Sequence, residues 1–278
     1  MTVNGISVRD AGSAVGAEIS GVDLSRPLTE AARETIRHAL AQRGVVFFRD
    51  QSLTPDQHIA LARQFGDINV NRFFSHLEGY PEIALVEKEP KQTKNIGGGW
   101  HTDHSYDRVP AMGSLLYARE TPPRGGDTQF ASMYAAYDAL SEGLKQTLAG
   151  LRAVHSSRHV FGHMREGMEG RLHNPELAIQ DAVHPVVIRH PESGRKALYV
   201  NPGFTLRFEG WTDDESRPLL SFLYQHAVQP EFVHRFAWQP GSLAFWDNRA
   251  TWHYAVNDYH GARRSMHRIT LHGSPLAA

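Results

Sequence analysis

The sequence predicts an α+β fold with a jelly-roll core and flanking helices. Many short apolar runs separated by turn residues indicate strands, whereas only a few stretches repeat their apolar residues at helical spacing. Two groups of candidate metal ligands lie far apart, near residues 101 and 253, and the opposed sheets of such a barrel bring distant segments together. No repeat, low-complexity tract or linker divides the chain, so we expect one domain spanning residues 1–278.

Two helices of the N-terminal half are marked by the residues at their ends. The stretch from Thr29 to Arg43 has helical spacing and is followed by Gly44, a residue type that commonly ends helices. Thr54 caps the second helix, and Gln57 completes a capping box with it. Runs of β-branched and aromatic residues predict strands. These strands are expected at residues 15–19, 45–48 and 82–87.

The C-terminal half continues this mixture of helices and strands. Residues 132–149 are helical in two pieces divided near Ser141, and Thr212 and Glu215 form a capping box that opens another helix. Residues 157–182 have no sustained period, which is typical of a lid, a binding loop or a disordered connection. Strands are expected at residues 112–119, 151–156, 183–189 and 196–201, the last two as a hairpin, and in short segments between 231 and 272.

The composition argues against several classes of function. The formal net charge is −1, so no basic surface for nucleic acid or an anionic membrane is indicated. The absence of cysteine rules out disulfides, thiolate metal sites and cysteine nucleophiles, and it suits a reducing compartment. The first residues lack the basic start and apolar run of a signal peptide, and no apolar run approaches the roughly 20 residues of a membrane span. We therefore expect a cytoplasmic protein.

A His-x-Asp pattern at His101 and Asp103 is the main candidate for chemistry. In a strand, alternation places both side chains on one face as adjacent metal ligands and directs His104 away from them. The pattern alone is weak, because the chain has 17 histidines, and a structural histidine would then be the better interpretation. His253, which follows a Trp-Asp-Asn-Arg turn in an aromatic strand, adds a third ligand. Two histidines and one carboxylate form a facial triad that leaves three positions open on Fe(II).

Four segments, taken in their order along the chain, resemble the taurine dioxygenase family, which includes the 2,4-dichlorophenoxyacetate dioxygenases. They are His101-Thr102-Asp103, the Gly125-Gly126-Asp127-Thr128 turn, the Trp-Asp-Asn-Arg-x-x-x-His run of residues 246–253 and the Arg-rich residues 263–268. Residues 18–24 and the hairpin near residue 194 extend the resemblance over nearly the whole chain. The resemblance implies a double-stranded β-helix and an enzyme that depends on Fe(II), 2-oxoglutarate and O2.

The resemblance also implies roles for individual residues. His101, Asp103 and His253 match the iron ligands and so the catalytic centre, whereas Thr128 and Arg264 match the residues that hold the far carboxylate of 2-oxoglutarate.

Substrate contacts are implied at a second set of positions. Arg268 matches the residue that grips the sulfonate in taurine dioxygenase, and its spacing of four from Arg264 places both on one face of a strand. Asn71, Phe74 and Gly97 stand where that enzyme has other residues, so its amine-recognising pair is missing. The aromatic character is kept at Phe161 and Phe204. We expect a small anionic organic substrate, such as a carboxylate, sulfonate or alkyl sulfate with a less polar body than taurine.

The expected reaction is hydroxylation with release of succinate and CO2, followed by fragmentation where the hydroxylated carbon bears a heteroatom. Two alternatives remain: a zinc-dependent hydrolase, because imidazole and carboxylate also suit zinc, and a non-catalytic anion-binding protein on the same fold. The sequence argues against the hydrolase, because it has no candidate general base near the motif and no His-Glu-x-x-His helix. A phosphate-binding loop at residues 97–99 is not expected, since neither Lys-Ser/Thr nor a helix follows. The family also predicts a homo-oligomer, either a dimer or a tetramer.

Overall fold

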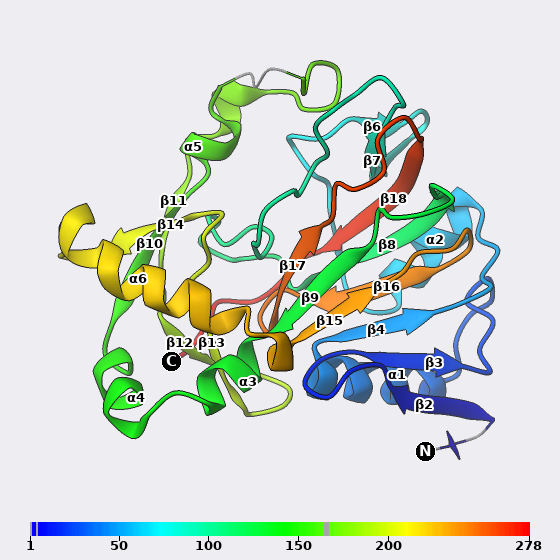
Figure 1. Ribbon diagram of the computed structural model, residues 1–278. Coiled ribbons are helices and arrows are strands. Elements are labelled where there is room, and N and C mark those ends of the chain that lie inside the picture. The colour runs from blue at the N-terminus through cyan, green and yellow to red at the C-terminus, as the bar shows by residue number, and fades with distance from the viewer. Residues whose placement is uncertain (1, 4, 164–166) are drawn as a thin grey trace.

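A large, mostly antiparallel sheet carries helices on one face and a smaller sheet on the other (Figure 1). The computed structural model describes residues 2–3, 5–163 and 167–278. The helices are α1 (Glu30–Arg43), α2 (Pro55–Arg63), α3 (Met133–Asp138), α4 (Glu142–Leu148), α5 (Arg158–Phe161) and α6 (Asp213–Ala227), with 3₁₀ turns η1 (Pro175–Leu177) and η2 (Pro230–Phe232). The architecture is the expected α+β class with a jelly-roll, or double-stranded β-helix, core.

The large sheet has the strand order β1-β2-β3-β4-β16-β8-β18-β7-β6, and β5 pairs with β18. The smaller sheet has the order β15-β9-β17, and two further sheets, β11-β10-β14 and β12-β13, complete the fold. The strands are β1 (Thr2–Val3), β2 (Ile6–Asp10), β3 (Ala17–Ser20), β4 (Val45–Phe48), β5 (Ile68–Asn69), β6 (His76–Leu77), β7 (Tyr80–Lys88), β8 (Gly113–Glu120), β9 (Thr128–Ser132), β10 (Arg152–Ser156), β11 (Asp181–Pro185), β12 (Val187–Arg189), β13 (Lys196–Leu198), β14 (Thr205–Phe208), β15 (Val233–Phe236), β16 (Leu243–Asp247), β17 (Thr251–Ala255) and β18 (Arg264–Leu271).

The helix ends follow the capping chemistry of the sequence. The Thr29 hydroxyl accepts a hydrogen bond from a backbone N–H of the first turn of α1, and Gly44 ends that helix with φ 73°. Thr54 and Gln57 form both hydrogen bonds of the predicted capping box of α2, and the box predicted for α6 is formed as well. The helical stretch 132–149 divides into α3 and α4 at Ser141. These predictions are confirmed.

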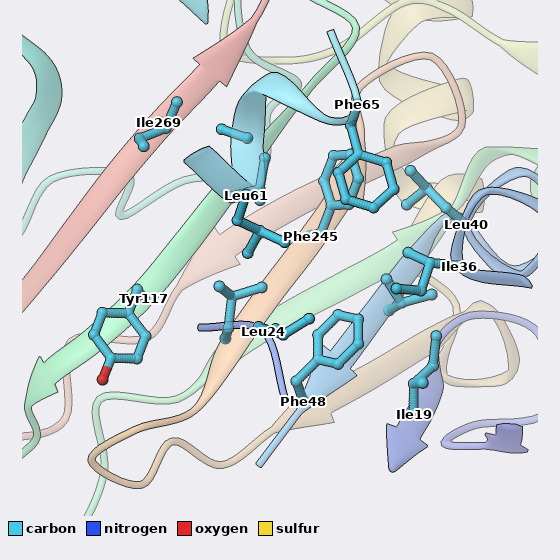
Figure 2. Close-up of a cluster of buried hydrophobic side chains, with 14 of the residues drawn as sticks. Ile19, Leu24, Ile36, Leu40, Phe48, Leu61, Phe65, Tyr117, Phe245 and Ile269 are labelled. Atoms are coloured by element: carbon cyan, nitrogen blue, oxygen red, sulfur yellow. The ribbon is translucent and has the colours of Figure 1, made fainter. Parts of the chain in front are cut away.

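Strand β4 shows how one strand serves two cores. Val46 and Phe48 face α1 and α2 and join the cluster of buried side chains in Figure 2. Val45 and Phe47 point to the opposite face and pack with residues of the smaller sheet. Successive side chains of a strand lie on opposite faces, so a run of four apolar residues is expected where both faces are covered.

The same alternation determines what β18 offers to the interior. Ile269 packs against the helices, whereas Met266 belongs to the core between the two sheets. Arg264 and Arg268 share the face of Met266, and both are buried. Two buried guanidinium groups therefore lie between the sheets, where β9 and β17 face β8 and β18 (Figure 1).

Two expectations about strands are wrong. Residues 101–103 do not form a strand: His101 makes an isolated bridge and Asp103 lies in a turn that continues to Tyr106. Residues 183–189 form two strands, because β11 pairs with β10 while only β12 forms the predicted hairpin with β13. The connection 157–182 contains α5 and η1, and residues 164–166 of it lie outside the described part of the chain.

No helix in the described ranges is long and apolar enough to cross a membrane. The predicted homo-oligomer and the predicted cytoplasmic location stay predictions from the sequence.

Candidate active site

Backbone pairing brings His101 and His253 together. Each donates its N–H to the other's carbonyl, at 3.1 and 2.8 Å, which joins the loop before residue 101 to β17. The two imidazole rings consequently lie side by side with centroids 4.1 Å apart. The Nδ1 atom of His101 lies 2.7 Å from the carbonyl oxygen of Gly99, an acceptor that places the proton on Nδ1 and leaves Nε2 free to bind a metal.

Asp103 reaches the two histidines from its turn. Its carboxylate oxygens lie 3.7 Å from Nε2 of His101 and 3.8 Å from Nε2 of His253. Within the described residues, these three side chains form a group whose ligand atoms all lie within 4.8 Å of one another. The prediction that they meet was correct, but the turn rather than strand alternation causes it.

The pKa shifts of Asp103 and His253 suit a cation. Burial raises the pKa of Asp103, but the Arg268 guanidinium, followed by the imidazoles of His253 and His101, holds that pKa below its usual value. Burial, and after it the charge of His101, lowers the pKa of His253 to about 3. An ionised carboxylate and a neutral imidazole are the forms that bind a metal.

Thr128 and Arg264 lie in the same cavity as the triad. The Thr128 hydroxyl accepts a hydrogen bond of 2.9 Å from the Trp238 indole, which leaves its own proton available to a ligand. Arg264 donates from Nε to the Gly126 carbonyl, whereas its buried Nη2 has no partner among the described residues. A buried guanidinium whose donor has no partner among the described residues fits the carboxylate of a small ligand.

Arg268 lies closer to the triad. Its Nη1 is 3.4 Å from both carboxylate oxygens of Asp103, and its guanidinium is 4.3 Å above the centre of the Phe74 ring. Its Nε is buried and has no partner in the described chain. Asn71 uses its side-chain oxygen to accept the backbone N–H groups of Phe73 and Phe74, so it shapes the wall beside Arg268.

All predicted site residues line one cavity of about 770 Å³, including Gly97, Phe161 and Phe204. Gly97 has φ 77°, and a Cβ there would lie 3.4 Å from Cε1 of the His101 ring. Phe161 comes from α5 and stacks on Phe73 with ring centroids 4.4 Å apart. The cavity is thus polar at the triad and two arginines and aromatic over much of its remaining wall, while the roles of individual residues stay predictions.

Several lining residues were not predicted. Tyr106 packs edge-on against Phe204 at 4.8 Å, and Gly203 lies so close to His101 that a Cβ would meet the Cβ of that histidine at 2.7 Å. His104 also lines the cavity, although strand alternation directed it away. An aromatic residue three positions after Asp103 was a usable signal for Tyr106. The approach of Gly203 depends on tertiary packing and has no local signal.

The donor set decides which group fits this centre. Two imidazoles and one carboxylate on a jelly-roll core are the facial triad of non-haem Fe(II) oxygenases. Two imidazoles lie beside one carboxylate, and nearby arginine donors have no partner within the described ranges, so the site fits Fe(II) together with an anionic co-substrate. The fold and site therefore define the class of non-haem iron oxygenases.

Known proteins identify the family within this class. A family described as "Taurine catabolism dioxygenase TauD, TfdA family" matches residues 7–270. The alkylsulfatase of Acinetobacter baylyi is 36% identical over 266 residues, covering 93% of this chain and 82% of that protein. The alpha-ketoglutarate-dependent sulfate ester dioxygenase of Pseudomonas putida is 33% identical over 274 residues, covering 96% and 90%. The crystal structure of a taurine dioxygenase from Burkholderia xenovorans has TM-score 0.83 and 39% identity, covering 97% and 92%.

The chain belongs to the TauD/TfdA family. It is a 2-oxoglutarate-dependent non-haem iron dioxygenase, an oxidoreductase that uses Fe(II), 2-oxoglutarate and O2. This membership favours the iron enzyme over both the zinc hydrolase and the non-catalytic protein.

Proposed function

We propose that this enzyme hydroxylates a small organic anion with an apolar body, such as an alkyl sulfate, a sulfonate or a carboxylate. In this proposal His101, Asp103 and His253 hold Fe(II). Thr128 and Arg264 bind the far carboxylate of 2-oxoglutarate, and Arg268 binds the anionic group of the substrate. The two arginines can serve two different anions because each presents a planar fork of donors.

The observation that carries the substrate class is the environment of Arg268. Its guanidinium is buried beside the triad carboxylate, lies on an aromatic ring and has an Nε donor without a partner in the part of the chain that the structure describes. A buried cation with free donors favours an anion, and the aromatic walls from Phe74, Phe161 and Phe204 favour an apolar substrate body. The names of the two relatives, an alkylsulfatase and a sulfate ester dioxygenase, agree with this class.

Taurine itself is a poor fit. Its ammonium group needs hydrogen-bond acceptors, and the oxygen of Asn71 already accepts two backbone N–H groups. Phe74 contributes only a ring that already lies against Arg268. An ammonium group buried here would lose its hydration without regaining acceptors, which is costly.

The chain's own residues bind, orient and exclude water, while the bound iron supplies the oxidising chemistry with O2 and 2-oxoglutarate. Arg268 would fix one end of the substrate next to Asp103, so that the first carbons beyond the anionic group lie nearest the triad. For an alkyl sulfate, hydroxylation at the carbon that bears the ester oxygen gives an unstable product. Its C–O bond breaks, the hydroxyl proton leaves, and an aldehyde and sulfate are released together with succinate and CO2.

The test uses purified enzyme with Fe(II), 2-oxoglutarate and air, and it measures succinate for n-hexyl sulfate, hexanesulfonate, hexanoate and taurine. We expect one of the first three to raise succinate well above the substrate-free rate, with hexanal and sulfate as products of the sulfate ester. Arg268→Met should remove that stimulation. Absence of stimulation by every anion would contradict the substrate class. Sulfate release with Zn(II) and without 2-oxoglutarate would instead support the assignment as a zinc-dependent hydrolase.

A further inference from the structure

His104 holds an uncommon backbone conformation next to the candidate metal ligand Asp103. Its φ is 58°, in the left-handed region that residues other than glycine rarely adopt, and its side chain is buried. Such strain persists only where surrounding contacts maintain it, and it is common at functional sites. The contacts of the His104 ring therefore indicate what the strain maintains.

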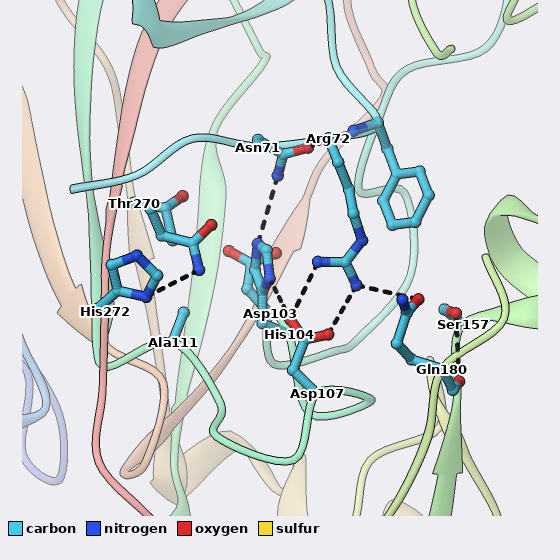
Figure 3. A network of polar contacts seen from close by, with 12 residues as sticks. Asn71, Arg72, Asp103, His104, Asp107, Ala111, Ser157, Gln180, Thr270 and His272 are labelled. Carbon is cyan, nitrogen blue, oxygen red and sulfur yellow. Dashed lines mark hydrogen bonds and ion pairs between the residues drawn. The ribbon is translucent and has the colours of Figure 1, made fainter. Parts of the chain in front are cut away.

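The His104 ring lies between two polar partners (Figure 3). Its Nε2 is 3.3 Å from Nδ2 of Asn71, and its Nδ1 is 3.0 Å from a carboxylate oxygen of Asp107. The Asn71 oxygen accepts two backbone N–H groups, so the amide nitrogen is the atom that faces His104. Nε2 consequently accepts from Asn71, and Nδ1–H donates to Asp107.

Asp107 anchors this arrangement from the other side. Arg72 makes a two-pronged ion pair with it, at 2.7 and 3.3 Å, and also donates to the side chain of Gln180 (Figure 3). The backbone carbonyl of Asp107 lies 3.0 Å from Nε2 of His184. The ring of His104 is therefore fixed on the side away from Asn71.

These contacts belong to a closed ring of contacting residues around the proposed anion site. His104 follows Asp103 directly and bonds to Asn71. Asn71 accepts the backbone N–H of Phe74, the Phe74 ring lies against Arg268, and Arg268 contacts Asp103. The position of the Arg268 guanidinium relative to the triad thus depends on the loop of residues 71–74, which His104 ties to the turn that carries Asp103.

We propose that His104 is a positioning residue that holds the loop of residues 71–74 against the turn of Asp103 and thereby fixes Arg268 for substrate binding. Its effect on substrate rests on the proposed anion-binding role of Arg268, whereas its effect on the loop does not. His104 affects Arg264 only at a distance, so binding of 2-oxoglutarate should be independent of it.

A matched pair of variants separates the two ring nitrogens. His104→Gln places an acceptor near Nε2 and keeps the bond to Asn71, whereas His104→Asn places a donor near Nδ1 and keeps only the bond to Asp107. Asparagine tolerates the left-handed backbone well, so a defect of His104→Asn reflects the lost contact rather than strain. Asn71→Ala removes the same contact from the other side and serves if His104→Asn folds poorly.

The first measurement is hydrogen exchange of residues 70–76 without any ligand. We expect His104→Asn and Asn71→Ala to exchange about fivefold faster or more, as loss of one hydrogen bond predicts, and His104→Gln to resemble the wild type. Adding His104→Asn to Asn71→Ala should change little further. The positioning role would be overturned if neither His104 variant exchanged faster than the wild type, or if both exchanged faster to the same extent.

The second measurement is anaerobic titration of the iron enzyme with 2-oxoglutarate and then n-hexyl sulfate, followed by the visible charge-transfer band. We expect His104→Asn to weaken n-hexyl sulfate binding about fivefold or more with unchanged 2-oxoglutarate affinity, and His104→Gln to retain both. Weakened 2-oxoglutarate binding in His104→Asn would overturn the proposal. If wild type binds no anion of the panel while loop exchange changes as expected, the positioning of the loop stands and the anion role of Arg268 fails.

Discussion

Two adjacent arginines at the start of β18 and just before it show how position determines the role of a side chain. Arg263 is partly exposed and pairs with Glu87, Glu89 and Glu120 at the surface. Arg264 points to the opposite side, is buried and keeps a donor without a partner in the described chain. The same residue type thus neutralises acids on one face and offers charge to a ligand on the other.

We predict that Arg264→Lys raises the KM for 2-oxoglutarate by about tenfold with a smaller change in kcat. Lysine keeps the charge but loses the planar fork that binds a carboxylate through two hydrogen bonds. Steady-state succinate assays at varied 2-oxoglutarate measure the effect. Arg263→Lys is the matched control and should leave KM unaltered. An equal KM for both variants would remove Arg264 from the co-substrate site.

Asp103 leads to a second prediction at this scale. Asp103→Ala should lower Fe(II) affinity by more than about 100-fold and abolish substrate-coupled succinate formation, because it removes one of the three proposed ligands and the partner of Arg268. Iron retained after gel filtration and succinate yield are the measurements. Asp214→Ala, on the exposed side of α6, controls for loss of an acidic residue. Normal succinate yield from Asp103→Ala would show that the triad is misassigned.

At the scale of elements, the turn before β14 is packed tightly against His101. A Cβ on Gly203 would lie 2.7 Å from Cβ of His101, and that atom cannot move without the backbone. Gly203 therefore permits a close approach that fixes His101.

We predict that Gly203→Ala displaces His101 and lowers turnover by about 10- to 100-fold, since small misplacements of reacting groups are costly. Gly143→Ala in α4 is the control, because no described atom beyond its chain neighbours and its own helix backbone lies within 4 Å of a Cβ there, and it should raise the free energy of unfolding by about 0.5 kcal/mol. Succinate assays and denaturant unfolding of both variants measure this. Full activity of Gly203→Ala would mean that the loop adapts without moving the ligand.

The elements also show what the sequence was able to predict. Thr54 and Thr212 marked helix starts correctly because capping is local chemistry. The strand at residues 101–103 was wrong, because the chain leaves the bridge at His101 and turns, with His104 in the left-handed region. The motif order identified residues that the fold places in one cavity, while their roles stay predictions. The bond between Asn71 and His104 joins loops 33 residues apart, and nothing in the local sequence specifies it.

At the scale of the whole molecule, the two cores on either side of the large sheet differ in the polarity of their buried side chains. The core beneath α1 and α2 consists largely of apolar side chains, part of which Figure 2 draws, whereas the interior between the sheets also holds buried arginines and the triad. His58 of α2 is an exception in the first core. It is 1% exposed and lies against the Tyr117 ring.

Burial of His58 makes the fold sensitive to acid. Burial lowers its pKa to about 3, whereas the unfolded chain has the ordinary value of 6.5. Below pH 6.5 the unfolded state therefore binds a proton that the folded state excludes. The stability that His58 contributes as a neutral buried group is therefore fully present above pH 6.5 and is lost as the pH falls towards 3. Between pH 6.5 and 5 this one histidine costs about 2 kcal/mol.

We predict that His58→Leu reduces the loss of unfolding free energy between pH 7.5 and pH 5 by about 2 kcal/mol, because leucine fills the site without a titrating group. Urea unfolding of metal-free protein at both pH values measures this, since metal binding itself depends on pH. His38→Gln, on the exposed side of α1, is the control and should keep the wild-type difference, because water reaches that position in both states. The same pH dependence in His58→Leu and wild type would place the acid sensitivity elsewhere, with the buried His155 and His184, whose pKa values burial also lowers, as the next candidates.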